Sequence, residues 1–235
     1  MENKTLKDNI KEGFVASLPI VIGYFPIAIA FGLMAKNISL TIWDTSLLSI
    51  LVYAGASQFM ALELILAGVS PLNIVIATFL LNIRHMMMTA SLSVEFENIP
   101  RKSLPIIGFG ITDETFSVIS FNKDKINLPY VSIICLLSYL SWVAGTVIGY
   151  GVGEILPESL QTSLSIGLYA MFAALLFPEF KNSNKTLLIA LIAAAIYIII
   201  YYTNILNSGW DIIAAIVLSS WIGVLVFAKN EEVRN

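Results

Sequence analysis

The sequence predicts an all-α integral membrane protein, a polytopic bundle of about seven to eight transmembrane helices. Of its 235 residues, 57% are hydrophobic and only 12% are charged, whereas a soluble domain carries about 25% charged residues. The apolar residues gather in runs of about 20, the helix length that spans a bilayer core of about 30 Å. A water-soluble fold of this size could not hide so much apolar surface.

Eight stretches satisfy this criterion, and turn residues separate them. They cover approximately 13–35, 46–67, 71–94, 103–121, 128–151, 161–178, 185–204 and 209–228. We expect a cytoplasmic tail at residues 1–12, a single transmembrane domain at 13–228 and a C-terminal tail at 229–235. The fourth stretch carries two acids and could instead be a buried re-entrant segment.

The distribution of Lys and Arg indicates that the N-terminus faces the cytoplasm, because these residues resist translocation. With eight crossings, the inside segments hold nine such residues and the outside segments three, namely Lys36, Arg101 and Lys102. If the fourth stretch does not cross, the side assigned to every later segment reverses.

The first stretch is predicted to be broken near its middle, because it contains Pro19 and Pro26 with Gly23 between them. Proline removes a backbone donor and clashes with the preceding turn. A broken helix exposes backbone groups that transporters use to hold a carboxylate or an ion. A simple kink is the alternative.

A cation lies inside the third stretch, where Arg84 precedes His85 in an otherwise apolar run. Residues equally far from the turn of a helical hairpin lie at equal depth. Arg84 and Asp113 are each about fourteen residues from the turn near 98–99, so we expect them to meet. An opposite charge would offset much of the cost of an ion in hydrocarbon. Snorkelling of Arg84 to the interface is the alternative.

The same count predicts a wider polar layer. Gln58 comes level with Leu81, one residue from Asn82, and a count over the first loop reaches Tyr24. His85 could equally be an interhelical hydrogen-bonding residue. The predicted layer comprises Gly23, Tyr24, Gln58, Asn82, Arg84, His85, Asp113 and Glu114.

Two further patterns concern packing and symmetry. Gly145, Gly149 and Gly153 recur every four residues and form a smooth face for a helix of the same chain or a second subunit. "SILVYA" at 49–54 is similar to "SIGLYA" at 165–170. This similarity suggests a possible internal repeat, as in many transporters.

Several function classes find no support. The chain has one His and one Cys, which predicts no metal site or cofactor, and its short Gly and Ser motifs do not match those of an enzyme. A net charge of -3 without a basic cluster gives no footprint for nucleic acid. A channel would need rings of like groups. One mixed polar layer beside a broken helix fits a substrate carrier best.

Six segments taken in order resemble the AzlC family, the large subunits of two-component branched-chain amino-acid exporters. They are "GYFPIAIAFGLMA", "YAGASQFMAL", "LLNIRHMMM", "ITDETFSV", "WVAGTVIGYGVG" and "LYAMFAALL". The similarity runs from about residue 13 to 180. It implies proton-driven export of neutral, chiefly branched-chain amino acids such as valine across the bacterial cytoplasmic membrane, together with a small AzlD-type membrane subunit.

A hypothesis for the mechanism assigns the predicted layer to the parts of such a substrate. Gly23, Tyr24 and Arg84 would attract the carboxylate, and Gln58 and Asn82 would orient the substrate. Asp113 or Glu114 would receive the ammonium or a proton, with His85 as a further proton-coupling residue. A permease for another small amphiphilic solute and a channel remain as alternatives.

Overall fold

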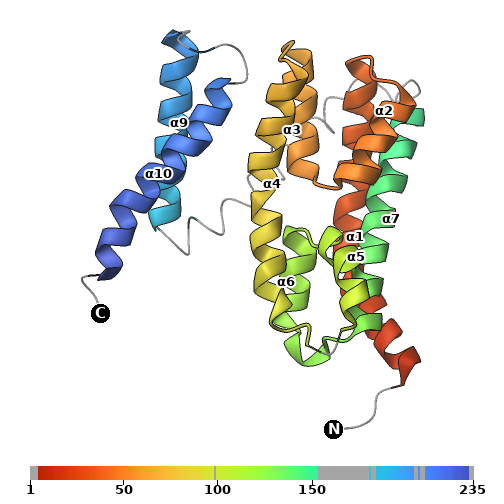
Figure 1. Ribbon diagram of the computed structural model, residues 1–235. Helices are drawn as coiled ribbons and strands as arrows, with labels where there is room; N and C mark the ends of the chain where they lie inside the picture. The colour runs from red at the N-terminus through yellow and green to blue at the C-terminus, as the bar shows by residue number, and fades with distance from the viewer. Residues whose placement is uncertain are drawn as a thin grey trace. The chain divides into compact units, whose positions relative to one another are not determined.

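The computed structural model describes residues 5–97, 99–152, 180, 184–203, 206 and 210–232, and the regular elements in these ranges are helices (Figure 1). The chain forms two compact units, one of Met1–Leu62 with Leu81–Leu168 and one of Glu63–Leu80 with Tyr169–Asn235. Among the described residues, four helices are long and apolar enough to cross a membrane. They are α1 (Leu6–Asn37), α4 (Pro71–Ser93), α7 (Leu128–Val152) and α9 (Asn184–Thr203).

Helix α1 is continuous, so the predicted break near Gly23 is wrong. Pro19 and Pro26 lie inside the helix, and both are exposed on its outer side. One turn before Pro26, the carbonyl of Val21 accepts a hydrogen bond from the Ser141 hydroxyl of α7 at 2.9 Å. Pro26 leaves the carbonyl of Ile22 without its helical donor, so the Ser141 bond ties α1 to α7 beside that position and does not replace the lost bond.

Helices α1 and α7 run side by side in the same direction. Gly13 faces Tyr130 near the start of both helices, and Gly32 faces Thr146 near the end of both. A Cβ at Gly32 would lie 2.1 Å from the Thr146 carbonyl oxygen, so the two backbones are in direct contact. The pair forms the core of the first unit.

Two of the three glycines spaced by four residues lie in this contact. A Cβ at Gly145 would lie 2.8 Å from the Phe25 carbonyl oxygen, and one at Gly149 would lie 2.2 Å from that of Ile29. The face is therefore covered by α1 of the same chain. Gly153 lies outside the described residues.

The second predicted stretch, 46–67, is interrupted and does not form one helix. It consists of α2 (Ile42–Leu47), the π-helical segment η1 (Leu48–Val52) and α3 (Gly55–Leu66). Tyr53 has a left-handed backbone with φ 43° and ψ 47°, which costs roughly 1–2 kcal/mol for a residue with a Cβ. Its ring offsets this cost by packing, buried, against the rings of Phe109 and Tyr139.

The interruption at Tyr53 reverses the chain. Along η1, the Ser49 hydroxyl forms a hydrogen bond with the Thr146 hydroxyl at 2.7 Å, and the Ile50 carbonyl accepts one from the Tyr139 hydroxyl at 3.1 Å. Because Tyr139 precedes Thr146 in α7, η1 runs toward the start of α7. Helix α3 then runs back, because Gln58 Nε2 donates to Ser49 Oγ at 3.0 Å. Residues 42–66 form the first hairpin.

The fourth predicted stretch, 103–121, is also a hairpin. Its elements are η2 (Arg101–Ser103), α5 (Leu104–Phe109), α6 (Asp113–Phe121) and η3 (Lys123–Lys125). Helix α6 runs parallel to the second half of α4, because Asp113 contacts Arg84 near its start and Lys123 contacts Glu95 just past its end. Residues 104–121 form the second hairpin, so this stretch is not one continuous span, and the re-entrant alternative describes it.

Helix α5 is the first helix of the second hairpin and runs toward its reversal. Gly108 lies beside the Thr89 methyl group of α4, and the chain reverses after Gly110. A Cβ at Gly110 would lie 2.5 Å from that of Cys135. The reversal can therefore approach α7 this closely only because residue 110 has no side chain.

The two hairpins enter from opposite ends of α7, and their reversal points meet between those ends (Figure 1). The ring centroids of Tyr53 and Phe109 are 5.8 Å apart. Each hairpin thus returns to the side from which it came. Arg101 and Lys102 of η2 therefore lie at the same end of the second hairpin as Lys123 and Lys125 of η3, whereas eight crossings would separate them.

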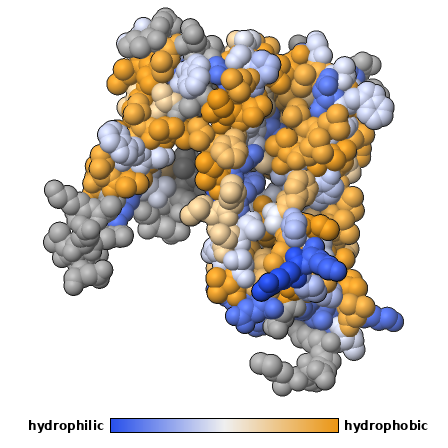
Figure 2. All heavy atoms as spheres, in the orientation of Figure 1, coloured by the Kyte–Doolittle hydropathy of each residue, from blue (hydrophilic) through white to orange (hydrophobic). Residues whose placement is uncertain are grey.

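Apolar side chains cover most of the face drawn in Figure 2, as expected for a protein in contact with lipid. Exposed examples are Ile22 of α1, Met86 of α4 and Leu140 of α7. In the second unit, α9 packs against α10 (Trp210–Glu232). The predicted span at 161–178 and the second copy of the possible repeat, 165–170, lie outside the described residues.

Candidate functional site

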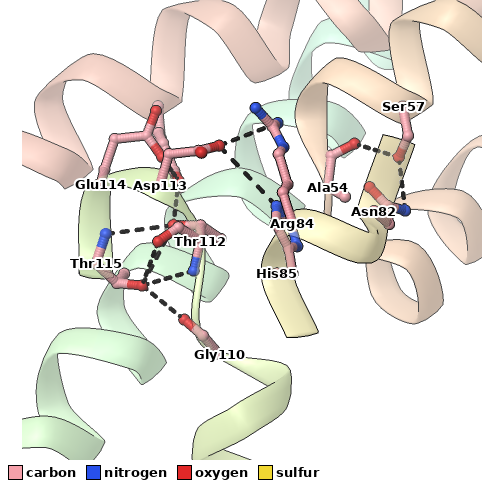
Figure 3. Close-up of polar contacts among 11 residues, drawn as sticks. Ala54, Ser57, Asn82, Arg84, His85, Gly110, Thr112, Asp113, Glu114 and Thr115 are labelled. Atoms are coloured by element: carbon pink, nitrogen blue, oxygen red, sulfur yellow. Dashed lines mark hydrogen bonds and ion pairs between the residues drawn. The ribbon is translucent and has the colours of Figure 1, made fainter. Parts of the chain in front are cut away.

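The centre of the candidate site is an ion pair between α4 and the start of α6 (Figure 3). Arg84 Nη2 lies 3.0 Å from Asp113 Oδ2, and His85 Nε2 lies 4.0 Å from the same oxygen. The side chains are partly buried, with exposed fractions of 37% for Arg84 and 29% for Asp113. The depth count predicted this pairing, and the cation does not snorkel away from its partner. Arg84 keeps a buried Nε with no hydrogen-bond partner among the described residues.

The N-terminus of α6 presents both acids at this depth. Thr112 is its N-cap, and its hydroxyl accepts from the Thr115 backbone N–H, while Thr115 Oγ1 accepts from the Thr112 N–H at 2.8 Å. This reciprocal cap fixes where the helix begins. Asp113 and Glu114 then occupy the first turn, where the helix dipole favours negative charge.

The two neighbouring acids have different partners. Asp113 points to the cations of α4, whereas Glu114 accepts a hydrogen bond from the Tyr24 hydroxyl of α1. The same hydroxyl lies 2.7 Å from Thr112 Oγ1. Among the described residues, no cation lies within ion-pair distance of Glu114. The Tyr24 ring is buried and meets the Trp142 ring edge-on.

A second set of polar groups surrounds the reversal of the first hairpin. Asn82 Nδ2 donates to Ser57 Oγ at 3.0 Å, and this hydroxyl donates to the Ala54 carbonyl at 2.9 Å (Figure 3). Gln58 is fully buried and donates to Ser49. The carbonyl oxygens of Gln58 and Asn82 have no hydrogen-bond partner among the described residues. Two acceptors are thus held in place with capacity for a further donor.

Seven of the eight residues in the predicted layer take part in these contacts, and Gly23 does not. Gly23 is exposed, and a Cβ built there would meet no atom within 4 Å. Because α1 is continuous, Gly23 offers no free backbone groups either. The structure therefore gives Gly23 no contact with the other predicted residues, and the interrupted helices lie elsewhere.

The sequence analysis missed several polar residues of the site. They are Ser49, Tyr53, Ser57, Thr112, Thr115 and Thr146. One signal was available: in "TDET" a Thr precedes two acids and another Thr follows at the fourth position, a spacing typical of a helix N-terminus. The small hydroxyls buried between helices gave no comparable signal.

All these contacts fall in the part of the chain that a known family matches. Residues 19–156, more than half of the sequence, match the family described as AzlC protein. The chain belongs to the AzlC family. The resemblance in its sequence motifs is confirmed, and the chain is a polytopic membrane protein of that family.

Relatives in the AzlC family cover most of the chain. A protein of Archaeoglobus fulgidus named uncharacterized membrane protein is 32% identical across 91% of this chain and 95% of its own. The inner membrane protein YgaZ of Escherichia coli is 31% identical across 79% of each chain. The branched-chain amino acid transport protein AzlC of Bacillus subtilis is 26% identical across 74% of this chain and 69% of its own. No solved structure matches significantly.

The comparisons place the chain in a family of membrane transport proteins that is associated with branched-chain amino-acid transport. Every polar residue described above, from Tyr24 to Thr146, lies within the matched region. The central ion pair and the two hairpin reversals therefore belong to the part of the molecule that defines the AzlC family.

Proposed function

We propose that this chain exports branched-chain amino acids such as valine across the bacterial cytoplasmic membrane and couples export to proton movement. The Escherichia coli relative is named an inner membrane protein, and the Bacillus subtilis relative is named for branched-chain amino acid transport. The observation that carries the proposal is the ion pair of Arg84 and Asp113 at the meeting point of two helical hairpins. Intramembrane ions at such a point mark a substrate path.

The chemistry of the site matches the three parts of the substrate. Arg84 has a buried Nε without a partner, so it can attract the carboxylate. The free carbonyl oxygens of Gln58 and Asn82 can accept from the ammonium group. Asp113 and Glu114 provide negative charge for the ammonium or a proton. Helix α3 begins at the reversal of the first hairpin, and the positive end of its dipole adds attraction for an anion.

The fold offers a simple way to expose this site to one side at a time. Each hairpin stands between the site and one end of α7. Moving one hairpin would open the site to that side while the other keeps it closed. Interrupted helices around a central site are a recurrent arrangement in secondary transporters.

The resemblance to two-component exporters suggests a small AzlD-type membrane subunit as partner. We expect the active unit to be this chain together with that subunit. Transport by the chain alone, compared with transport by the pair, tests this part of the proposal.

Counterflow in liposomes tests the function. Vesicles that contain the two-subunit complex are loaded with unlabelled valine and diluted into labelled valine, and a carrier accumulates label by exchange. A panel of amino acids and other small amphiphilic solutes then defines the substrate. A second experiment uses vesicles without loaded valine and imposes a pH gradient across their membrane. Accumulation of labelled valine in these vesicles measures proton-driven transport separately.

Three results would contradict the proposal. A pore would dissipate the valine gradient without accumulating label. Exchange of another solute class, with no neutral amino acid exchanged, would indicate a different permease. Exchange that does not respond to an imposed pH gradient would remove the proton coupling and leave a facilitator.

A further inference from the structure

We propose that Glu114 carries the coupled proton and that its bond to Tyr24 is a latch between α6 and α1, which proton uptake weakens. Asp113, in this view, is the fixed counterion of Arg84. The inference deepens the proposed function and rests on it for the coupled solute. The latch itself is a property of three side chains in contact.

The first step is the different surroundings of the two acids. Asp113 faces Arg84 at 3.0 Å and His85 at 4.0 Å. A proton added to Asp113 would leave the Arg84 charge without its counterion, at a cost in a partly buried site. A proton added to His85 would place a second positive charge beside Arg84. A proton added to Glu114 disrupts no ion pair among the described residues.

The second step is the hydrogen count at Tyr24. Its hydroxyl has one hydrogen and two close oxygen neighbours, Thr112 Oγ1 at 2.7 Å and Glu114 Oε2. With Glu114 ionised, Tyr24 donates to the carboxylate and can accept from the Thr112 hydroxyl. With Glu114 protonated at Oε2, the carboxyl donates to Tyr24, and Tyr24 donates to Thr112. One added proton therefore reverses the direction of both bonds.

The reversal changes the strength of the contact between two elements. A hydrogen bond to a carboxylate is about twice as strong as one between neutral groups. Tyr24 is on the continuous helix α1, and Glu114 is on the inner end of the second hairpin. The ionised latch thus holds the second hairpin against α1, and protonation loosens it.

The network extends to the reversal of the second hairpin. Thr115 Oγ1 lies 3.3 Å from Thr112 Oγ1 and donates to the Gly110 carbonyl at 2.9 Å (Figure 3). A change of donor at Thr112 therefore reaches the residue at which α5 ends. The second hairpin is the element whose position the proton would control.

The remaining titratable groups around Glu114 come from the neighbouring elements. Tyr53 at the reversal of the first hairpin interacts with Glu114 and with Cys135 and Tyr139 of α7. Tyr53, Cys135 and Tyr139 carry hydroxyl or thiol groups, which have no positive charge to pair with the Glu114 carboxylate. Arg84 and His85 of α4 contact the adjacent Asp113. Glu114 is therefore the carboxyl of the cluster whose charge is free to change.

The transport test compares Glu114→Gln with Glu95→Gln in the two-subunit complex. Glu95 is a carboxyl in the turn after α4 that pairs with Lys123 away from the site, so its variant should keep the full response to a pH gradient. In Glu114→Gln, transport should no longer respond to a pH gradient. Valine counterflow, which needs no proton gradient, should be reduced by a smaller factor than pH-driven transport. An unchanged response in Glu114→Gln, or its loss in His85→Gln instead, would overturn the assignment.

The latch is tested without transport by measuring a distance. Spin labels at Ile22→Cys on α1 and Phe121→Cys on α6 occupy exposed positions, with the native Cys135 changed to Ala. The distance distribution should shift between alkaline and acidic buffer. Adding Glu114→Gln or Tyr24→Phe should remove the shift. A distribution that does not depend on pH in the labelled parent, or a shift that persists in Tyr24→Phe, would overturn the latch.

The two measurements separate this inference from the proposed function. If the wild-type complex exchanges no valine, the proposed function fails, and the distance measurement still decides the latch. If valine exchange is intact and the distance never responds to pH, the carrier stands and the latch fails.

Discussion

Two adjacent acids have different partners because of where their helix begins. Successive residues of an α-helix point about 100° apart, so Asp113 and Glu114 at the start of α6 face different neighbours. Asp113 meets Arg84 of α4, and Glu114 meets Tyr24 of α1. The Thr112 cap fixes this register. A shift of one residue in the start of α6 would move one acid to the position of the other and leave a threonine facing the remaining partner, so the cap is part of the site.

The ion pair should contribute to stability as well as to function. Arg84→Gln leaves the Asp113 charge without its main partner. Because the pair is partly exposed, we expect a loss between that of a surface pair and that of a buried pair, about 1–3 kcal/mol. Thermal unfolding of the purified protein in detergent measures it. Arg84→Asp combined with Asp113→Arg should recover stability relative to either single change.

The exposed pair of Lys123 and Glu95 provides the matched control. Lys123→Gln removes one partner of an ion pair whose cation is 59% exposed, against 37% for Arg84, so the expected loss is below about 1 kcal/mol. Equal losses from Lys123→Gln and Arg84→Gln would mean that the central pair is no better shielded than a surface pair.

The buried amide of Gln58 should matter for transport more than for folding. Its Nε2 donates to Ser49, and its Oε1 has no partner among the described residues. Gln58→Leu loses one hydrogen bond and also removes one unsatisfied buried atom. These effects are of similar size, so stability should change by less than about 1 kcal/mol. Valine counterflow should fall strongly. Thr78→Val, which removes a hydroxyl bonded to its own helix, should retain counterflow.

At the scale of elements, hydrophobic length predicted α1, α4, α7, α9 and α10 within two residues, except that α1 begins about two turns earlier and α10 ends about one turn later. The positions of the interruptions were not predictable by the same reasoning. Pro19 and Pro26 predicted a break, but α1 is continuous and both prolines lie on its exposed side. Tyr53 marks a real reversal without any proline. Its cause is tertiary, because Phe109 and Tyr139 bury its ring.

The depth count succeeded for Arg84 and Asp113 for a related reason. The count assumed one long helix after the turn. In the structure, α5 runs from the turn to the reversal of the second hairpin, and α6 runs back from there. Since α5 and the residues that follow it still reach the depth of Arg84, the two charges meet. Distance from the turn was sufficient to predict the pair, but not the path of the chain beyond it.

The contact between α1 and α7 should tolerate no added methyl group at Gly149. A Cβ there would lie 2.2 Å from the Ile29 carbonyl oxygen, and this backbone atom can move only if the helices separate. Overpacking costs about 1–3 kcal/mol, which exceeds the helix-propensity gain of about 1 kcal/mol. Gly149→Ala should lower the unfolding temperature.

Gly151 on the same helix is the matched control. A Cβ there would meet no atom within 4 Å, so Gly151→Ala should gain propensity and raise stability by up to about 1 kcal/mol. Stabilisation by both substitutions would show that α1 and α7 are further apart than this packing requires.

At the scale of the whole molecule, the hairpins determine how the chain crosses the membrane. Because the first and second hairpins return to the sides they came from, the candidate spans among the described residues up to Val152 are α1, α4 and α7. Basic residues then separate clearly. Lys7, Lys11, Arg101, Lys102, Lys123 and Lys125 share the side of the N-terminus, and Lys36 is on the other. This separation agrees with the positive-inside rule better than eight crossings did.

Accessibility to a membrane-impermeant thiol reagent distinguishes the two topologies. Lys102→Cys and Lys125→Cys, each in a Cys135→Ala background, should react from the cytoplasmic side alone, because η2 and η3 flank the second hairpin. Lys36→Cys, at the end of α1, should react from the outside and serves as the control. If residues 103–121 crossed the membrane, positions 102 and 125 would react from opposite sides. The two hairpins would then not oppose each other, and a site opened alternately by each of them would lose its structural basis.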